Sequence, residues 1–447
     1  MDNMLGTEKI SVLFWKFGIP AVIAMLINAS QTIIDGLFLG NFIDKYAMAA
    51  VSIVNPYLNL VTGVAFMVGI GSLSIIGRRL GAGEVKKAQD VFRSAQVVAG
   101  AMVTLIVILG ILFPREIATI LRADTELIEY STVYLRISIC FAPFFIFMIM
   151  FGLMSRMIEK PNQYLIATII SLVGNIILNT LFIAVFKWGI VGAALATGFS
   201  QVIAFIVVLI PMLNRNNKLN VFVGKINKAS IPEMLYNGSS EAVVSMSAAV
   251  TTFLFNNAFM DMNGADGVAS FTIINYIIVF GTMMMFGISD GIGSVISYNY
   301  GSNRHDRVRN IIKLSIISNV IVGVILYSII LVSGENLVGL FASENDSMEV
   351  IAIATKGAKI MAVMFLMSGI SIVLSGYFTA IGKAKESIFI ALSRGSIFIL
   401  IGITILPMIS EEHGIWLVMP FAEAATIIIG IVLVLRDGKL LERENKL

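Results

Sequence analysis

Long apolar runs separated by short polar segments dominate the chain. An α-helix rises about 1.5 Å per residue, so about 20 apolar residues cross the hydrocarbon core of a bilayer. Polar and apolar residues do not alternate with a period of two, as they would in a transmembrane barrel. The pattern therefore predicts an all-α polytopic membrane protein with twelve transmembrane helices, at 17–39, 47–77, 95–113, 131–155, 163–186, 188–212, 236–260, 267–297, 314–332, 360–380, 386–407 and 414–435.

Composition agrees with this pattern. The 447 residues are 57% hydrophobic and 13% charged, whereas a soluble domain has about 25% charged residues. The first ten residues are polar, and the first apolar run is too long for a cleavable signal peptide. We expect a multi-pass protein of the cell inner (cytoplasmic) membrane that contacts membrane lipid.

The basic residues predict its orientation. Most of the 31 Lys and Arg residues fall in segments that lie on one side if both termini are cytoplasmic, including the cluster Arg78, Arg79, Lys86 and Lys87. Positively charged loops stay in the cytoplasm, so an even number of spans with both ends inside is expected. This distribution also accounts for the net charge of +3 without any binding of nucleic acid.

The two halves of the chain form an internal repeat. Glycine, asparagine and basic positions recur at one constant offset: Gly18 with Gly238, Asn55 with Asn275, Gly71 with Gly291, Gly81 with Gly301 and Lys87 with Arg307. An even number of spans per half makes the repeat parallel, related by a pseudo-two-fold axis along the membrane normal. We therefore predict two six-helix lobes, the N-lobe (1–213, helices 1–6) and the C-lobe (233–447, helices 7–12), joined by a cytoplasmic linker (214–232).

This architecture is that of secondary transporters whose lobes rock around a central site, although a repeat alone does not prove transport. Asp35 is the strongest candidate for such a site. It is the only charged residue of the first apolar run, and a carboxylate at that depth costs at least a few kcal/mol. Asn28 and Gln31 precede it at helical spacing, so the three side chains share one face of the helix.

Polar side chains of other helices lie at similar depth. Counted from the predicted helix ends, Asp35 is roughly 8 Å from the outer surface and the others are roughly 12 to 18 Å from it. These groups, which could surround Asp35, are Asn55 and Asn59 of the second helix, Asn175 and Asn179 of the fifth, and Thr197 of the sixth. Such residues also form structural hydrogen bonds between helices. For Asn28 and for Asn59, each considered by itself, this is the simpler interpretation.

Three further acids are predicted inside helices. Glu241 lies near the cytoplasmic end of helix 7, Asp290 near the inner end of helix 8, and Glu423 within helix 12. Each could relay protons or contact a cation. The alternative is pairing with Arg394 or with basic residues of the loops. Asn275, the repeat partner of Asn55, is a further candidate.

At these positions the chain resembles the multidrug and toxic compound extrusion (MATE) family of transporters over nearly its whole length. The motifs are Ile34-Asp35-Gly36, Arg79-Leu80-Gly81-Ala82-Gly83, Asn175-Ile176-Ile177-Leu178-Asn179, Gly189-Ile190-Val191-Gly192-Ala193-Ala194 and Ile296-Ser297-Tyr298-Asn299-Tyr300-Gly301. The last of these is the most specific.

The resemblance implies a two-lobe exporter driven by inward Na⁺ or H⁺, with no cofactor besides this coupling ion. The coupling site of similar bacterial members matches Asp35, Asn175, Asn179 and Thr197, which would also be the possible Na⁺ ligands. Pro20 matches a family proline whose bending is proposed to accompany coupling; a static kink is the alternative.

The chain departs from the family pattern at two places. Position 179 is usually Asp and is Asn179 here, so Asp35 is the one ionisable group of the expected site. In another branch of the family, acidic coupling residues lie deep in helices 7 and 10. The corresponding positions here are Ala248 and Ser368.

The leading hypothesis is a monomeric secondary antiporter that exports amphipathic, cationic drugs or metabolites in exchange for Na⁺ or H⁺. A lipid-linked oligosaccharide flippase of the same superfamily is the alternative, but it would require a cationic cavity for pyrophosphate. An intramembrane enzyme is disfavoured, because His305 and His413 are predicted in loops on opposite sides and no phosphate-binding loop is present.

Overall fold

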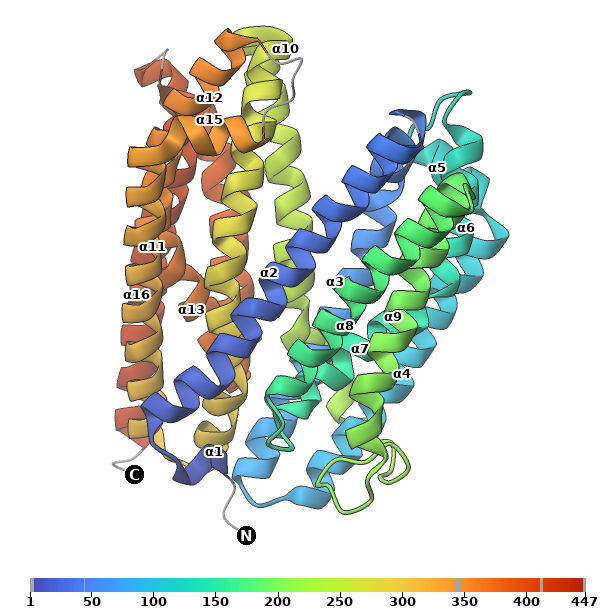
Figure 1. The fold of residues 1–447 in the computed structure, drawn as a ribbon. Helices are drawn as coiled ribbons and strands as arrows, with labels where there is room; N and C mark the ends of the chain where they lie inside the picture. Colours follow the sequence, from blue (N-terminus) through green and yellow to red (C-terminus); the bar gives the residue numbers. More distant parts are fainter. Residues whose placement is uncertain (1–3, 44, 342–346, 411–412, 445–447) are drawn as a thin grey trace.

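The computed structural model describes residues 4–43, 45–341, 347–410 and 413–444, and this part of the chain consists of helices without strands (Figure 1). Within these residues, eleven helices are long and apolar enough to cross a membrane, and the bent pair α6 (Ile128–Cys140) and α7 (Ala142–Ser155), counted as one span, makes twelve. The predicted all-α architecture with twelve spans is therefore confirmed.

The other elements of the first half are α1 (Met4–Thr7), α2 (Ile10–Phe42), α3 (Lys45–Gly81), α4 (Val85–Leu112), α5 (Pro114–Ile120), α8 (Asn162–Asn179), the π-helix η1 (Thr180–Val185) and α9 (Gly189–Leu213). The second half opens with α10 (Ser230–Gly301), which contains two spans, a first arm (Ser230–Gly264) and a second arm (Asp266–Gly301). The chain reverses between them at Gly264, whose φ of 59° lies in the left-handed region.

The remaining elements are α11 (His305–Phe341), α12 (Met348–Met361), η2 (Ala362–Met364), α13 (Phe365–Ile381), α14 (Ala384–Leu392), η3 (Ser393–Ile397), α15 (Phe398–Ile409) and α16 (Gly414–Glu444). Several helices are longer than the apolar runs that predicted them. The span expected at 314–332 is α11, and the span expected at 360–380 begins at Met348. Helices continue past the hydrocarbon with polar residues, so hydropathy alone underestimates their length.

One predicted helix is broken. The run expected at 131–155 bends by 47° between α6 and α7. Pro143 lies in the first turn of α7, where a proline is tolerated because the backbone N–H it lacks has no partner within the helix. The break at Phe141 is therefore a proline-associated bend.

The outward faces of these helices are apolar. Leu112, Ile177 and Val332 are 64%, 60% and 86% exposed. Exposed apolar side chains around a helical bundle are expected where lipid replaces water. This agrees with a multi-pass membrane protein.

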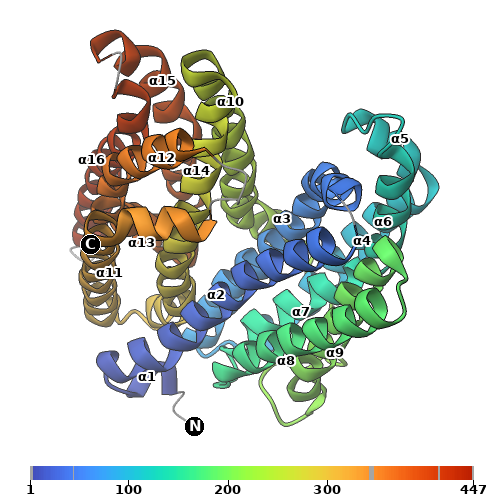
Figure 2. The same ribbon diagram turned by 45° about the horizontal axis from the view of Figure 1, so that its top comes forward.

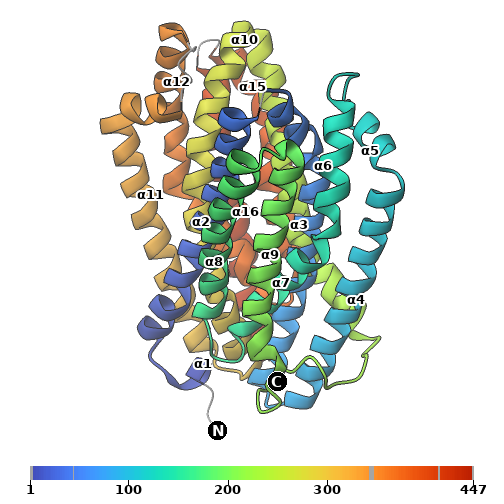
Figure 3. The ribbon, with the colours of Figure 1, turned by 45° about the vertical axis from the view of Figure 1, so that its right-hand side comes forward.

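The helices form two lobes that meet at the end of the molecule where both termini lie, here called the terminal side, and diverge at the other end (Figures 1 and 2). α3 to α9 form one lobe, and the second arm of α10 with α11 to α16 forms most of the other. α2 runs obliquely between them. Its lower half packs on α10, whereas α8 and α9 lie beside its upper half (Figures 1 and 3).

Repeat-related glycines form the contact between the lobes. A Cβ atom added to Gly238 would clash with the backbone of Met67, and one added to Gly71 would clash with Met234 and Gly238. The equivalent contact joins Gly291 to Phe17 and Gly18. Because the repeat exchanges Gly18 with Gly238 and Gly71 with Gly291, these two contacts are related by the pseudo-two-fold axis. Small residues allow membrane helices to approach this closely.

Polar contacts reinforce this terminal-side interface. The guanidinium of Arg156, 1% exposed at the end of α7, donates from Nη2 to Oδ2 of Asp290 at 2.7 Å and from Nη1 to the Asp290 carbonyl at 2.7 Å. Ser74 Oγ donates to the Thr379 carbonyl at 2.8 Å. Each contact joins one lobe to the other.

The N-terminal segment is bound to the second lobe. Asn299 Nδ2 donates to the carbonyl of Leu5 at 2.9 Å, and Arg307 Nη2 donates to that of Glu8 at 2.7 Å. Asn299 belongs to the most specific sequence motif and is fully buried. The motif therefore has a structural role, holding the start of the chain against the end of α10.

The segment between the lobes packs against α4. Gln89 donates to the carbonyls of Asn220 and Val223, and Lys225 N donates to Asp90 Oδ1 at 2.7 Å. α10 begins at Ser230, so the helix includes the last residues of the predicted linker 214–232.

Candidate functional site

The side chains of three helices meet around Asp35 in the half of the N-lobe away from the termini. Asn179 Nδ2 donates to Asp35 Oδ1 at 2.8 Å, and Thr197 Oγ1 donates to Asp35 Oδ2 at 3.4 Å. Asn179 Nδ2 also donates to Asn175 Oδ1 at 3.0 Å, and Asn175 Nδ2 donates to Thr197 Oγ1 at 3.2 Å. These four residues, here called the Asp35 cluster, form one closed hydrogen-bond network.

Helical geometry explains the network. Asn175 and Asn179 are four residues apart, so they share the face of α8 that packs on α2. Both are essentially buried, with 0% and 1% exposure. Burial of amides within a membrane protein requires partners, and the Asp35 carboxylate and Thr197 hydroxyl supply them.

The cluster has an unused acceptor. Asn179 Oδ1 is buried and has no hydrogen-bond partner among the described residues. Asn237 Oδ1 and Asn319 Oδ1 are further buried amide oxygens without a partner among the described residues, so the feature is not confined to this cluster. The two carboxylate oxygens of Asp35, Asn175 Oδ1, Thr197 Oγ1 and Asn179 Oδ1 are all of the ligand type that hard cations prefer.

The chemistry of this set fits a monovalent cation. It has one carboxylate among neutral oxygens, and the described residues contain no group of three or more His, Cys, Asp or Glu that could hold a metal ion. The cluster could equally exchange a proton at Asp35. Its residues are therefore suited to binding one positive charge at a time.

The other candidate residues of α2 do not belong to the Asp35 cluster. Asn28 Nδ2 donates to the hydroxyl of Tyr164 on α8 at 3.3 Å, consistent with a structural hydrogen bond between helices. Gln31 makes no hydrogen bond to a described residue. Pro20 is buried within α2.

Asn55 does not belong to the cluster, contrary to the sequence prediction. It is exposed, and no contact of a described residue joins it to Asp35. The depth estimate placed it at a suitable level, but depth does not determine which face of α3 an asparagine occupies.

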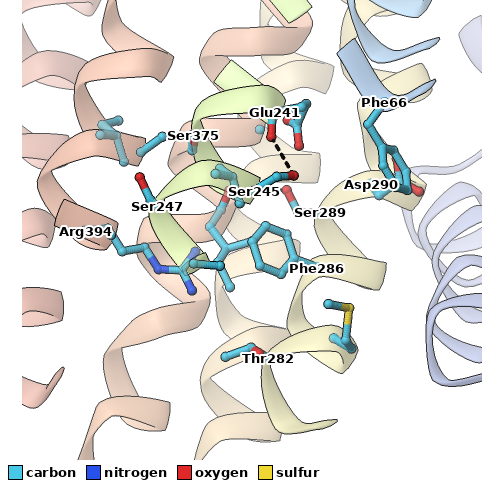
Figure 4. A pocket seen from close by; sticks show the side chains of 18 of the residues that line it. Phe66, Glu241, Ser245, Ser247, Thr282, Phe286, Ser289, Asp290, Ser375 and Arg394 are labelled. Carbon is cyan, nitrogen blue, oxygen red and sulfur yellow. Dashed lines mark hydrogen bonds between the residues drawn. The ribbon is translucent and has the colours of Figure 1, made fainter. Parts of the chain in front are cut away.

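A second, larger site lies between the lobes (Figure 4). It is a cavity of about 500 Å³, here called the central cavity. It is lined by α2 and α3 on one side and by α10, η2, α13, α14, η3, α15 and α16 on the other. Asn59 and Asn275 line it, together with the aromatic rings of Phe66 and Phe286. This volume is in the range that holds a drug-sized molecule.

All three additional acids line this cavity. Asp290 pairs with Arg156, as described above. Glu423 Oε1 accepts from Arg394 Nε at 2.7 Å, and Glu423 Oε2 accepts from Ser371 Oγ at 2.6 Å. Pairing, the alternative interpretation of these two acids, is therefore observed. The side chain of Glu241 has no such partner in the described part of the chain.

Two site residues escaped the sequence analysis. Arg156 was not singled out from the sequence, and it is buried against the opposite lobe. Phe286 lies beneath Arg394, whose guanidinium carbon is 5.2 Å from the ring centroid. The sequence shows that Arg156 directly follows an apolar run, which hints at burial. It does not show that Asp290 of the other half is the partner.

Comparison with known proteins places this architecture in a family. The MatE family model matches residues 20–181 and again residues 242–404, one match in each lobe. Multidrug export protein MepA of Staphylococcus saprophyticus is 28% identical over 420 residues, covering 93% of this chain and 90% of the relative. MepA of Staphylococcus aureus NCTC 8325 is 28% identical over 386 residues, covering 86% and 84%.

Solved structures show the same fold. An outward-facing multidrug resistance MATE family transporter of the MOP superfamily aligns with a TM-score of 0.92 at 19% identity, covering 98% of this chain and 99% of the other. A MOP superfamily transporter from Pyrococcus furiosus aligns with a TM-score of 0.89 at 19% identity, covering 96% and 97%. The duplicated match, the two lobes and the twelve spans agree: the chain belongs to the MatE family, which its sequence motifs resemble.

Proposed function

We propose that the chain is a secondary antiporter that exports amphipathic, cationic drugs or metabolites in exchange for Na⁺ or H⁺. The observation that supports this most strongly is the separation of two sites. The Asp35 cluster lies where α2 packs on α8 and α9 and has the chemistry to hold a single positive charge, whereas the central cavity lies between the lobes and has the size of a drug molecule. Coupling ion and substrate would therefore occupy different places.

Membership of the MatE family places the chain among transporters rather than enzymes. The relatives MepA are named multidrug export proteins, which supports the same substrate breadth here. We place both termini in the cytoplasm of a monomeric protein in the cell membrane. In this orientation the terminal-side interface separates the central cavity from the cytoplasm.

Transport requires the lobes to exchange their contacts. Export would begin with the terminal side open, so that substrate enters from the cytoplasm, and would end in the arrangement seen here, with the lobes diverging on the other side (Figure 1). A cation bound at Asp35 would change the packing of α2 against α8. Since the lower half of α2 packs on α10, this change reaches the contact between the lobes.

The flippase alternative lacks support in the central cavity. Among its lining residues Arg394 is the one basic side chain, and its charge is compensated by Glu423. Pyrophosphate recognition would require uncompensated positive charge.

The test is replacement of Asp35 by Asn, which keeps the size of the side chain and removes its charge. We expect Asp35→Asn to abolish efflux of a fluorescent cation from cells, with normal amounts of protein in the membrane. The matched control is Asp261→Asn, an exposed acid of α10 without a partner in the described chain, which should transport normally. Efflux by Asp35→Asn at the wild-type rate would refute the proposal.

A further inference from the structure

The charges that line the central cavity are not equivalent. Asp290 is compensated by Arg156 at 2.7 Å, and Glu423 is compensated by Arg394 at 2.7 Å. Glu241 lines the same cavity without an ion pair or a side-chain hydrogen bond in the described part of the chain. With ionised side chains, the paired groups cancel and the remaining charge of the cavity lies on Glu241. This carboxylate is therefore available to a cationic group.

Arg394 offers the opposite kind of contact. Its Nε is bound to Glu423, and the guanidinium lies over the ring of Phe286. The two Nη groups have no partner in the described chain, although a guanidinium carries five donors in a fixed fork. The side chain is 18% exposed, towards the cavity it lines (Figure 4). The Nη groups of Arg394 are therefore hydrogen-bond donors that line the cavity, although the ion pair of Arg394 with Glu423 has no net charge.

The two groups lie at different levels of the cavity. Thr251 Oγ1 donates to the Gly395 carbonyl at 2.7 Å, and Ser396 Oγ donates to Ser247 Oγ at 3.0 Å. Arg394 is therefore level with this part of the first arm of α10. Glu241 precedes Ser247 by six residues, which corresponds to roughly 9 Å along a helix axis.

Apolar side chains and hydroxyl groups line this part of the cavity together. Val244 and Ser245 lie between the two levels on the first arm of α10, and Phe66 and Phe286 face the cavity from α3 and from the second arm (Figure 4). A flat or apolar molecular body fits such a lining. The cavity thus has the unpaired carboxylate of Glu241 at one level and the guanidinium donors of Arg394 at the other, with aromatic rings and serine hydroxyls along its walls.

We propose that Glu241 and Arg394 determine substrate specificity as two separate contacts. Glu241 binds the cationic group of the substrate, and the Nη groups of Arg394 bind a carboxylate or carbonyl oxygen roughly 9 Å away. The class selected is an amphiphile with both groups, rather than a simple organic cation. This inference rests on the proposed function, because it assumes that the central cavity holds the exported molecule.

The test uses two fluorescent dyes, tetramethylrhodamine and tetramethylrosamine, which share a cationic ring system and differ in that only the first has a carboxylate. Transport into proteoliposomes is measured for the wild type, Glu241→Gln and Arg394→Lys. Lysine preserves the charge opposite Glu423 and loses the fork of donors. Glu335→Gln, an exposed acid of α11 outside the cavity, is the matched control and should behave as the wild type.

We expect Glu241→Gln to raise the KM for both dyes, and Arg394→Lys to raise it for tetramethylrhodamine alone. Loss of one charge-assisted hydrogen bond corresponds to roughly a tenfold change. Equal effects of Arg394→Lys on the two dyes, or no effect of Glu241→Gln on either, would overturn the inference.

Two further outcomes are distinguishable. If Arg394→Lys does not fold, the double variant Arg394→Gln with Glu423→Gln removes both charges, and the same difference between the dyes is expected. If the wild type transports neither dye under any imposed ion gradient, the proposed function fails. If the wild type transports the dyes but Arg394→Lys changes the KM of both equally, the specificity inference fails and the proposed function stands.

Discussion

The most informative residue of the Asp35 cluster is Asn179. As an amide it donates a hydrogen bond to Asp35, which an aspartate at this position could not do when ionised. Depth counted along the predicted helices placed Asn175, Asn179 and Thr197 near Asp35, together with Asn55 and Asn59. The family resemblance then singled out the first three. The depth estimate failed for Asn55, since depth does not specify the direction of a side chain around the helix.

A second carboxylate at position 179 should strengthen cation binding. In Asn179→Asp the 2.8 Å contact with Asp35 would join two like charges, whose repulsion is relieved by a bound cation. We expect the half-saturating concentration of the coupling ion to fall, measured as the ion dependence of dye transport in proteoliposomes. An unchanged or increased value would contradict this view of the cluster. The control is Asn28→Asp, which adds a carboxylate to the face of α2 that carries Asp35 but lies outside the cluster. It should leave the half-saturating concentration unchanged.

At the scale of helices, glycines determine how closely α3 and α10 approach. Their recurrence predicted two related halves, but sequence could not show that the repeated glycines meet each other across the pseudo-two-fold axis. The 47° break between α6 and α7 was also missed, because hydropathy remains uniform through Phe141. The number of helices can be predicted from the apolar runs. Bends within helices and contacts between them cannot, because they depend on how the helices pack.

The glycine contact gives an asymmetric prediction for two repeat-related positions. A Cβ atom at Gly238 would meet the backbone of Met67, whereas one at Gly18 would have no atom within 4 Å. Gly238→Ala should therefore destabilise the structure with closed terminal side, by about 1–3 kcal/mol, and Gly18→Ala should be tolerated. Thermal unfolding in detergent measures both. Equal melting temperatures of the two variants would show that the contact is not tight.

On the scale of the whole molecule, the lobes are joined at the terminal side by buried polar contacts that a transport cycle must break. The ion pair between Arg156 and Asp290 is one of these, with side-chain exposures of 2% and 9%. Sequence analysis predicted the lobes but could not predict this pair, because its members lie in different halves without any common pattern.

Removing one partner of this pair should cost more than removing both. Asp290→Asn leaves a buried guanidinium without a counter-charge, a change worth about 3–5 kcal/mol, whereas an apolar pair of similar volume is often neutral. We expect Asp290→Asn to lower the melting temperature and Arg156→Met with Asp290→Leu to recover much of the loss. Additive effects of the two single replacements would argue against a direct interaction.

The central claim is that Asp35 converts an ion gradient into export, and its most direct measurement is uphill flux in proteoliposomes. An imposed Na⁺ gradient and, separately, an imposed pH gradient are applied while accumulation of tetramethylrosamine is recorded. We predict accumulation by the wild type under one of these gradients, and mere equilibration by Asp35→Asn under both. Gradient-driven accumulation by Asp35→Asn equal to that of the wild type would contradict the account.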